Sequence, residues 1–211
     1  MNLTFKHLPI KFENIAFVER EKRNGRTVAN KCGRDFLYYA LSYYCPDLHN
    51  ESRGNPLDIE KRRPFGFSVP SWLVWTFLSF CRAPRYFASL GLELCINNQK
   101  ATTFFQFVKT AMSKSFSVDE ALRTIEIAVD NGLASGIDVS IALGGLIDHV
   151  MFVYGYDADN LYVIDTHKVK QLEYEKITRE NDPRYLMRLS KAIVRKRWSR
   201  FNRVWVVRSL S

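Results

Sequence analysis

Residues 148–165 have the sequence DHVMFVYGYDADNLYVID, and the prediction of the fold starts from the pattern of these residues. Two parts of it, Val150–Tyr156 and Leu161–Ile164, are rich in β-branched and aromatic residues, which is typical of strands. The residues between them have the Asp and Asn content of a turn. The stretch therefore predicts an antiparallel hairpin, with His149 at the start of one strand and Asp165 at the end of the other.

The register of this hairpin decides whether its histidine and its carboxylate can interact. A four-residue turn over Asp157–Asn160 pairs His149 with Lys168 and directs Asp165 to the opposite face. An odd-numbered turn pairs His149 with His167 instead, and then Asp165 lies diagonally on the same face. An interaction between His149 and Asp165 therefore requires an odd turn or a β-bulge.

The segments that flank the hairpin predict a larger sheet and one well-defined helix. Ile137–Leu143 alternates and is β-branched, as expected of a strand. Ser117 and Glu120 form a capping box at the start of a helix that ends at Asn131–Gly132. The other predicted elements are an extension of the sheet over Lys168–Tyr174, a helix over Pro183–Arg197 with Leu186, Leu189 and Ile193 on one face, and a last strand over Val204–Val207.

The N-terminal half is predicted to be mainly helical. Apolar residues recur at helical spacing over Cys32–Tyr44. The other predicted elements are an extended segment over Thr4–Glu19, a turn at Asn24–Gly25, a long surface loop over Pro46–Pro70, a buried helix over Ser71–Phe80 and a helix over Thr102–Met112. The fold class is therefore α+β, with a helical part over about residues 30–133 and a sheet part over about residues 137–211.

Length and composition indicate one soluble domain over residues 1–211. The chain is 46% apolar and 14% aromatic, with 10 Gly and 7 Pro, which excludes collagen-like and largely disordered chains. Four scattered cysteines do not make a disulfide scaffold. The net charge of +9 belongs to the segment after Asp182, which holds nine Lys and Arg and no acidic residue, while the preceding residues hold 22 basic and 22 acidic side chains.

The N-terminal end of the Cys32 helix is a candidate catalytic position. A thiol at a helix N-terminus feels the positive end of the macrodipole, which favours the thiolate. The following residue, Gly33, allows close approach of backbone or substrate. The alternative interpretation is a core cysteine, because free Cys is among the most buried residue types.

Other candidate residues point to weaker hypotheses. His167 also follows Asp165 closely and is an alternative to His149, but no carboxylate follows it at strand spacing. Cys45, Cys81 and Cys95 lack the CxxC or CxxH spacing of a zinc site, so we expect no metal and no cofactor. The basic C-terminal segment is either a nucleic-acid or acidic-membrane surface or the solvated face of a packed helix, and we favour the second.

No segment predicts export or membrane insertion. Residues 1–7 lack the apolar stretch of a secretory signal. The most apolar stretch, Val69–Cys81, contains Pro70 and is shorter than the roughly 20 residues that a bilayer requires. We therefore expect no membrane span and a cytoplasmic location, in which the cysteines stay reduced.

The order and spacing of these motifs resemble those of papain-like cysteine peptidases. The shared features are Cys-Gly at a helix start at Cys32, the pattern His-Val-x-x-Val-x-Gly-Tyr-Asp from His149, a turn, and Tyr-Val-x-Asp ending at Asp165. The likeness is greatest to the bacterial type that removes double-glycine leader peptides from bacteriocins, and it covers about residues 24–166. It implies that the Cys helix packs on a C-terminal antiparallel sheet.

The resemblance also implies roles for individual residues. Cys32 would be the nucleophile, His149 the general base and then acid, and Asp165 the orienting carboxylate. The family places a glutamine six residues before the cysteine as an oxyanion donor, and this chain has Arg26 there. Asn24 and Asn30 are alternative donors, and Gly33 and Asp148 are candidates for the rim of the substrate site.

The implied function is a cysteine peptidase that cleaves a peptide or isopeptide bond of a peptide or protein substrate through a thioester acyl-enzyme. Two alternatives remain. An acyltransferase would use the same three residues but pass the acyl group to an amine. A catalytically impaired papain-like binding module would fit Arg26 in place of glutamine and the basic C-terminal face.

Overall fold

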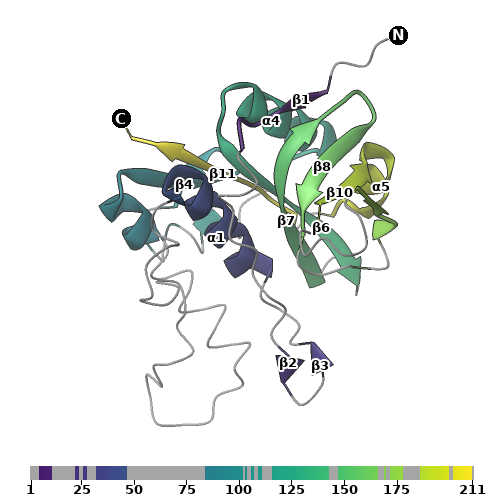
Figure 1. Cartoon of the computed structure of the whole chain (residues 1–211), viewed down its shortest axis with the longest axis horizontal. Coiled ribbons are helices and arrows are strands. Elements are labelled where there is room, and N and C mark those ends of the chain that lie inside the picture. Colours follow the sequence, from purple (N-terminus) through teal and green to yellow (C-terminus); the bar gives the residue numbers. More distant parts are fainter. Residues whose placement is uncertain are drawn as a thin grey trace.

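Within the described residues, the computed structural model packs helices against an antiparallel sheet, which makes the fold α+β (Figure 1). The structure describes residues 5–10, 22–23, 26–27, 32–46, 84–101, 103, 106, 109–110, 116–142, 147–165, 169, 172–177, 186–199 and 202–210. The labelled helices are α1 (Cys32–Tyr44), α4 (Val118–Asp130) and α5 (Lys191–Arg197), and residues 84–89 are also helical.

Among the described residues, nine strands form the main sheet, in the order β5-β4-β11-β6-β7-β8-β10-β9, with β1 beside the end of β7. They are β1 (Lys6–His7), β4 (Leu92–Ile96), β5 (Gln99–Lys100), β6 (Ala134–Ala142), β7 (Ile147–Tyr156), β8 (Asn160–Ile164), β9 (Glu175–Lys176), β10 (Leu186–Ser190) and β11 (Val204–Ser209). A separate hairpin joins β2 (Lys22–Arg23) to β3 (Arg26–Thr27). Its strands flank Asn24–Gly25, the dipeptide that predicts a turn.

Helix α1 has the bounds that its apolar spacing predicts, and it packs on the middle of the sheet. The ring of Phe36 lies 6.2 Å from that of Phe152 on β7 and 5.7 Å from that of Trp205 on β11, between ring centroids. Gly136 on β6 makes this approach possible, since a Cβ there would lie 2.5 Å from the Phe36 ring. The start of α1 is therefore held firmly against β6 and β7.

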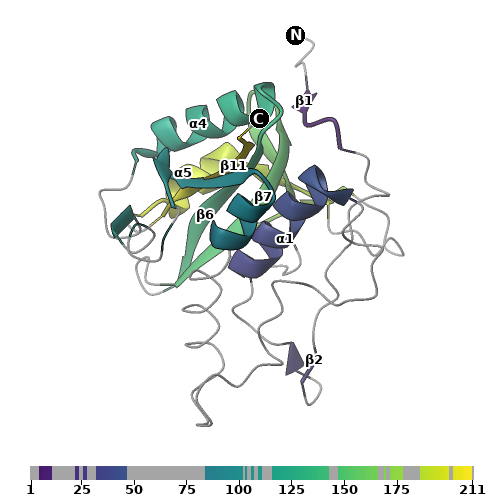
Figure 2. The ribbon, with the colours of Figure 1, turned by 90° about the vertical axis from the view of Figure 1, so that its left-hand side faces the viewer.

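Helix α4 begins with the predicted capping box. The Ser117 hydroxyl accepts from the Glu120 amide, and the Glu120 carboxylate accepts from the Ser117 amide. Helices α1 and α4 lie on opposite sides of the sheet (Figure 2). Two neighbours on β11 show why, since Trp205 packs on Phe36 of α1 whereas Val206 and Ala128 of α4 line one pocket.

The β7–β8 hairpin contains a bulge. Next to the turn, Tyr156 pairs with Leu161, which is the register of a four-residue turn. Beyond Tyr154 the register shifts by one, so that Val153 pairs with Val163. In this second register Asp165 lies opposite Met151 and diagonal to His149.

One predicted element is only partly correct, and another is wrong. Residues 186–190 of the predicted helix over Pro183–Arg197 form strand β10, which pairs with β8, and only Lys191–Arg197 is helical. The spacing of Leu186 and Leu189 fits a helix, but a short apolar run fits a strand equally well. Residues 186–190 form a strand because they pair with the edge of β8. The predicted sheet extension over Lys168–Tyr174 is not a strand at its described residues, and the strand follows at Glu175–Lys176.

The division into a helical half and a sheet half is also too simple. Strands β1, β4 and β5 come from the N-terminal part and belong to the main sheet. Every residue of β4 is buried, and its Glu93 is paired with Lys100 and Arg208. In the predicted helix over Thr102–Met112, residues 106, 109 and 110 are helical. The predicted loop after Pro46 and the predicted helix over Ser71–Phe80 lie outside the described residues.

Candidate active site

Cys32, His149 and Asp165 come together from three elements. Cys32 is the first residue of α1, His149 lies near the start of β7, and Asp165 directly follows β8. The Nε2–H of His149 donates to Oδ2 of Asp165 at 2.8 Å. Cys32 lies near the same imidazole and raises its pKa. Because Nε2 is used by the carboxylate, Nδ1 is the ring nitrogen that faces the thiol.

The bulge in β7 produces this arrangement. With the four-residue turn alone, Asp165 would point to the other face of the sheet. The one-residue shift at Tyr154 restores the diagonal relationship with His149. This meets the condition that the sequence sets for an interaction between His149 and Asp165. His167, the alternative histidine, lies outside the described residues.

The imidazole is buried, and its neighbours favour its charged form. His149 and Asp165 are each 3% exposed. Burial by itself lowers the pKa of His149, but the charge and hydrogen bond of Asp165, together with the nearby Cys32, outweigh it. The pKa of His149 is therefore raised well above its ordinary value.

A tyrosine that the sequence analysis does not single out also contacts the carboxylate. The hydroxyl of Tyr174 donates to Oδ2 of Asp165 at 2.6 Å. Tyr174 lies outside any strand, nine residues beyond Asp165, so no periodic pattern points to it.

A second carboxylate, Asp138 on β6, is buried near the imidazole. Its Oδ2 accepts from the indole N–H of Trp205 at 3.0 Å. Burial raises the pKa of Asp138 to about 7, although Trp205, Arg203 and His149 each oppose the rise. A lone carboxylate within a β-branched strand is the sequence signal that marks such a group.

The predicted oxyanion donors are only partly placed. Arg26 lies on β3, and its side chain is outside the description, as are Asn24 and Asn30. The backbone N–H of Cys32 belongs to the first turn of α1, where amides have no partner within the helix. It is therefore one of the donors that the first turn of α1 offers to an oxyanion.

The two predicted rim residues differ in their surroundings. Gly33 follows Cys32 in the first turn of α1 and is half-buried. Asp148 is tied to the protein interior, because its Oδ1 accepts from Ser140 and from Asn202, each at 3.2 Å. Burial raises the pKa of the Asp148 carboxyl. These contacts make Asp148 a structural link between β6, β7 and the segment before β11.

Much of the basic C-terminal segment is engaged by acidic groups of the same chain. Lys191 is buried and pairs with Glu126 at 2.6 Å. The exposed Arg195 pairs with Asp119 at 3.1 Å. The other pairings are Arg188 with Glu175 and Arg208 with Glu93. The buried Arg203 interacts electrostatically with Asp138 and Asp148. The interpretation as the face of a packed helix thus applies to α5, whereas Arg188 and Arg208 lie on strands.

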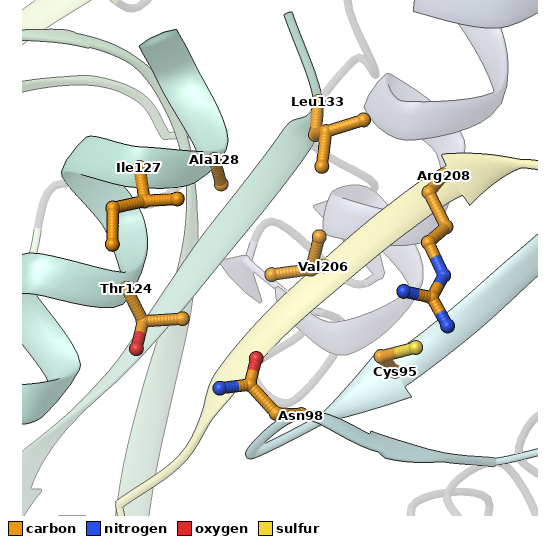
Figure 3. A pocket seen from close by; sticks show the side chains of 8 residues that line it. All are labelled: Cys95, Asn98, Thr124, Ile127, Ala128, Leu133, Val206 and Arg208. Carbon is orange, nitrogen blue, oxygen red and sulfur yellow. The ribbon is translucent and has the colours of Figure 1, made fainter. Parts of the chain in front are cut away.

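A pocket of about 220 Å³ lies on the α4 side of the sheet, apart from the candidate site (Figure 3). Its walls include Ile127 and Ala128 of α4, Val206 of β11, and Cys95 beside Arg208. Burial raises the pKa of the Cys95 thiol, which keeps it protonated. This pocket shares no residue with the predicted site.

In the described part of the chain, no group of three or more His, Cys, Asp and Glu side chains is placed to hold a metal ion. None of the helices in that part is long and apolar enough to cross a membrane. The most apolar stretch, Val69–Cys81, lies outside that part.

Comparison with known proteins adds no family assignment. No protein-family model matches the chain, and no curated protein matches it. The site therefore has to be interpreted from its own geometry.

Proposed function

We propose that this protein is a papain-like cysteine peptidase that cleaves a peptide or isopeptide bond of a peptide or protein substrate. One observation carries the proposal. A half-buried thiol at a helix N-terminus lies near a buried imidazole, and the imidazole donates to a buried carboxylate. Nucleophile, base and orienting group in one hydrogen-bonded row are what acyl transfer through a covalent intermediate requires.

The first half of the reaction follows from these contacts. The thiol of Cys32 gives its proton to Nδ1 of His149, and Sγ attacks the substrate carbonyl carbon. Asp165 holds the ring in position and stabilises the imidazolium. The positive end of the α1 macrodipole stabilises the negative charge on sulfur. The carbonyl π electrons move to oxygen, and the Cys32 amide donates to the oxyanion.

The second half releases both products. The tetrahedral intermediate collapses, the C–N bond breaks, and the imidazolium gives its proton to the leaving amine. A thioester remains on Cys32. The imidazole then takes a proton from water, and the hydroxide attacks the thioester carbon. The C–S bond breaks, the acid leaves, and the proton returns to sulfur.

The burial of the ion pair supports a catalytic role over a structural one. Removing a histidine and a carboxylate from water costs several kcal/mol for each ion unless they are paired. Here they are paired with each other, and the pKa of the imidazole is also raised by a nearby thiol that is itself only half-buried. Perturbed titratable groups next to an accessible nucleophile cluster at functional sites. A nucleophile of this kind must stay reduced, so we infer a reducing compartment such as the cytoplasm.

A chemical test needs no knowledge of the substrate, because α1 carries its own control. Cys45 directly follows the C-terminal end of α1 and is half-buried like Cys32. Iodoacetamide alkylation of each cysteine is followed by mass spectrometry at pH 6. We expect Cys32 to react at least about tenfold faster than Cys45, and His149→Gln to abolish the difference. Equal rates in the wild-type protein would overturn the proposal.

A second experiment tests the reaction. A peptide library is incubated with the wild-type protein and with Cys32→Ala, and new termini are read by mass spectrometry. We expect cleavage by the wild-type protein alone, and cleavage by Cys32→Ala would contradict the proposal. An added amine, such as glycine methyl ester, separates the alternatives. Free acid ends indicate a hydrolase, whereas amide ends indicate an acyltransferase.

A further inference from the structure

Asp165 accepts two hydrogen bonds on one oxygen. Its Oδ2 receives Nε2–H of His149 at 2.8 Å and the hydroxyl of Tyr174 at 2.6 Å. Tyr174 comes from the segment between β8 and β9, so its hydroxyl adds a contact from outside the hairpin. The oxygen that orients the imidazole is thus itself oriented by a second donor.

The direction of the Tyr174 hydrogen bond follows from its surroundings. Burial first, and then the charge of Asp165, raise the pKa of the phenol well above its ordinary value, so the hydroxyl keeps its proton. Its oxygen also lies 2.9 Å from Sδ of Met151. A carboxylate is a far stronger acceptor than a thioether, so the single proton goes to Asp165.

We propose that Tyr174 is a positioning residue of the candidate active site, which fixes the Asp165 carboxylate and limits its pull on the His149 imidazolium. The inference rests on the proposed function, because it assigns the tyrosine a part in the same reaction. Tyr174 acts through Asp165 and does not touch the substrate.

The chemistry explains why such a donor is useful. His149 must hold a proton while Cys32 attacks and then release it to the leaving amine. A bare carboxylate in a buried site would hold the imidazolium strongly and slow the release. A hydroxyl that donates to the same oxygen takes up part of its negative charge. It also holds the carboxylate in one rotamer, so the imidazole keeps its direction toward the thiol.

The test is the titration of His149 in wild-type protein and in Tyr174→Phe. The pH midpoint is followed by NMR of ¹⁵N-labelled imidazoles, and the signal among the four histidines is assigned by its loss in His149→Gln. We expect Tyr174→Phe to raise the midpoint by about half a pH unit or more, because the carboxylate then attracts the imidazolium more strongly. With a substrate, we expect kcat to fall about tenfold and KM to stay unchanged.

Tyr44→Phe is the matched control. Tyr44 lies at the end of α1, and its hydroxyl donates to the Val207 carbonyl at 2.6 Å, far along the helix from Cys32. We expect Tyr44→Phe to leave the midpoint unchanged. An unchanged midpoint in Tyr174→Phe, or an equal rise in both variants, would overturn the inference. If Cys32 reacts no faster than Cys45, the proposed function fails, but the His149 midpoint still tests the contact between Tyr174 and Asp165.

Discussion

The imidazole of His149 and the carboxylate of Asp165 are 2.8 Å apart, although the two residues belong to different strands of a hairpin whose turn register alone would separate them. The bulge at Tyr154 brings them to one face. Both side chains are buried, so their attraction is little screened by water. The consequences of this pairing, and of the packing that supports it, can be measured.

Substitution of Asp165 separates its charge from its hydrogen bond. We expect Asp165→Ala to lower kcat/KM by at least about a hundredfold, because the imidazole loses both its orientation and its counter-charge. Asp165→Asn keeps an acceptor for Nε2–H, so its loss is smaller. The amide lacks the charge that raises the pKa of His149, so the basic limb of the pH profile moves to lower pH. Equal losses and an unmoved limb in the two variants would contradict this role.

Asp138→Asn is expected to change how stability depends on pH. The pKa of Asp138 is about 7 in the folded protein and near 4 when the chain is unfolded. Between these values the folded state binds the extra proton, so wild-type stability falls as pH rises, by up to about 1.4 kcal/mol per pH unit from this group. Asn keeps an acceptor for Trp205 and removes the dependence.

The measurement for Asp138 is urea unfolding of both proteins at pH 4 and pH 7.5. The variant is expected to match the wild type at the lower pH and to exceed it at the higher one. An equivalent change at the exposed Asp119, Asp119→Asn, serves as the control. A constant difference at the two pH values would show that Asp138 is not the titrating group.

Gly136→Ala tests how closely α1 packs on the sheet. The added methyl would lie 2.5 Å from the ring of Phe36 and 2.9 Å from the Met151 carbonyl oxygen. We expect a loss of about 1–3 kcal/mol in the free energy of unfolding, and slower alkylation of Cys32 because the start of α1 is displaced. The neighbouring Ser135→Ala is the control, since the buried Ser135 hydroxyl has no hydrogen-bond partner in the described structure. Equal stabilities of the two variants would argue against the clash.

Asp157→Ala tests the turn between β7 and β8. The Asp157 carboxylate accepts from the amides of Asp159 and Asn160 at 2.8 and 2.7 Å and from the Tyr162 hydroxyl at 2.8 Å. Burial raises the pKa of Asp157, but these hydrogen bonds outweigh it and lower the pKa overall. We expect the variant to lose about 1–3 kcal/mol of stability at pH 7.

The same turn gives a pH signature. Because the folded pKa of Asp157 is depressed, its contribution is present above the unfolded pKa near 4 and is lost as pH falls through the folded value. The difference between wild type and Asp157→Ala in urea unfolding should therefore shrink toward pH 2. Asp159→Ala, at an exposed neighbour, should change stability by less than about 0.5 kcal/mol. A pH-independent difference would exclude the carboxylate as its source.

The sequence predicts several local elements because interactions between residues close in the chain determine them. Helix α1 has the predicted bounds, and α4 begins at the predicted capping box, since apolar spacing and capping act within one or two turns. Strands β6, β7 and β8 follow from alternation and β-branching. The sequence also names Cys32, His149 and Asp165 in the order in which a papain-like site would use them.

Other features of the fold and the site depend on contacts between segments far apart in the chain, so only the tertiary structure determines them. Leu186–Ser190 is a strand because it pairs with the edge of β8. Strand β4 is buried because it pairs with β11, and Lys100 and Arg208 neutralise its Glu93. The bulge at Tyr154 and the contact of Tyr174 with Asp165 leave no mark in local periodicity. Residue types and spacing determine which groups are available for chemistry, whereas long-range pairing and packing determine which of them meet, because those contacts are shared between segments far apart in the chain.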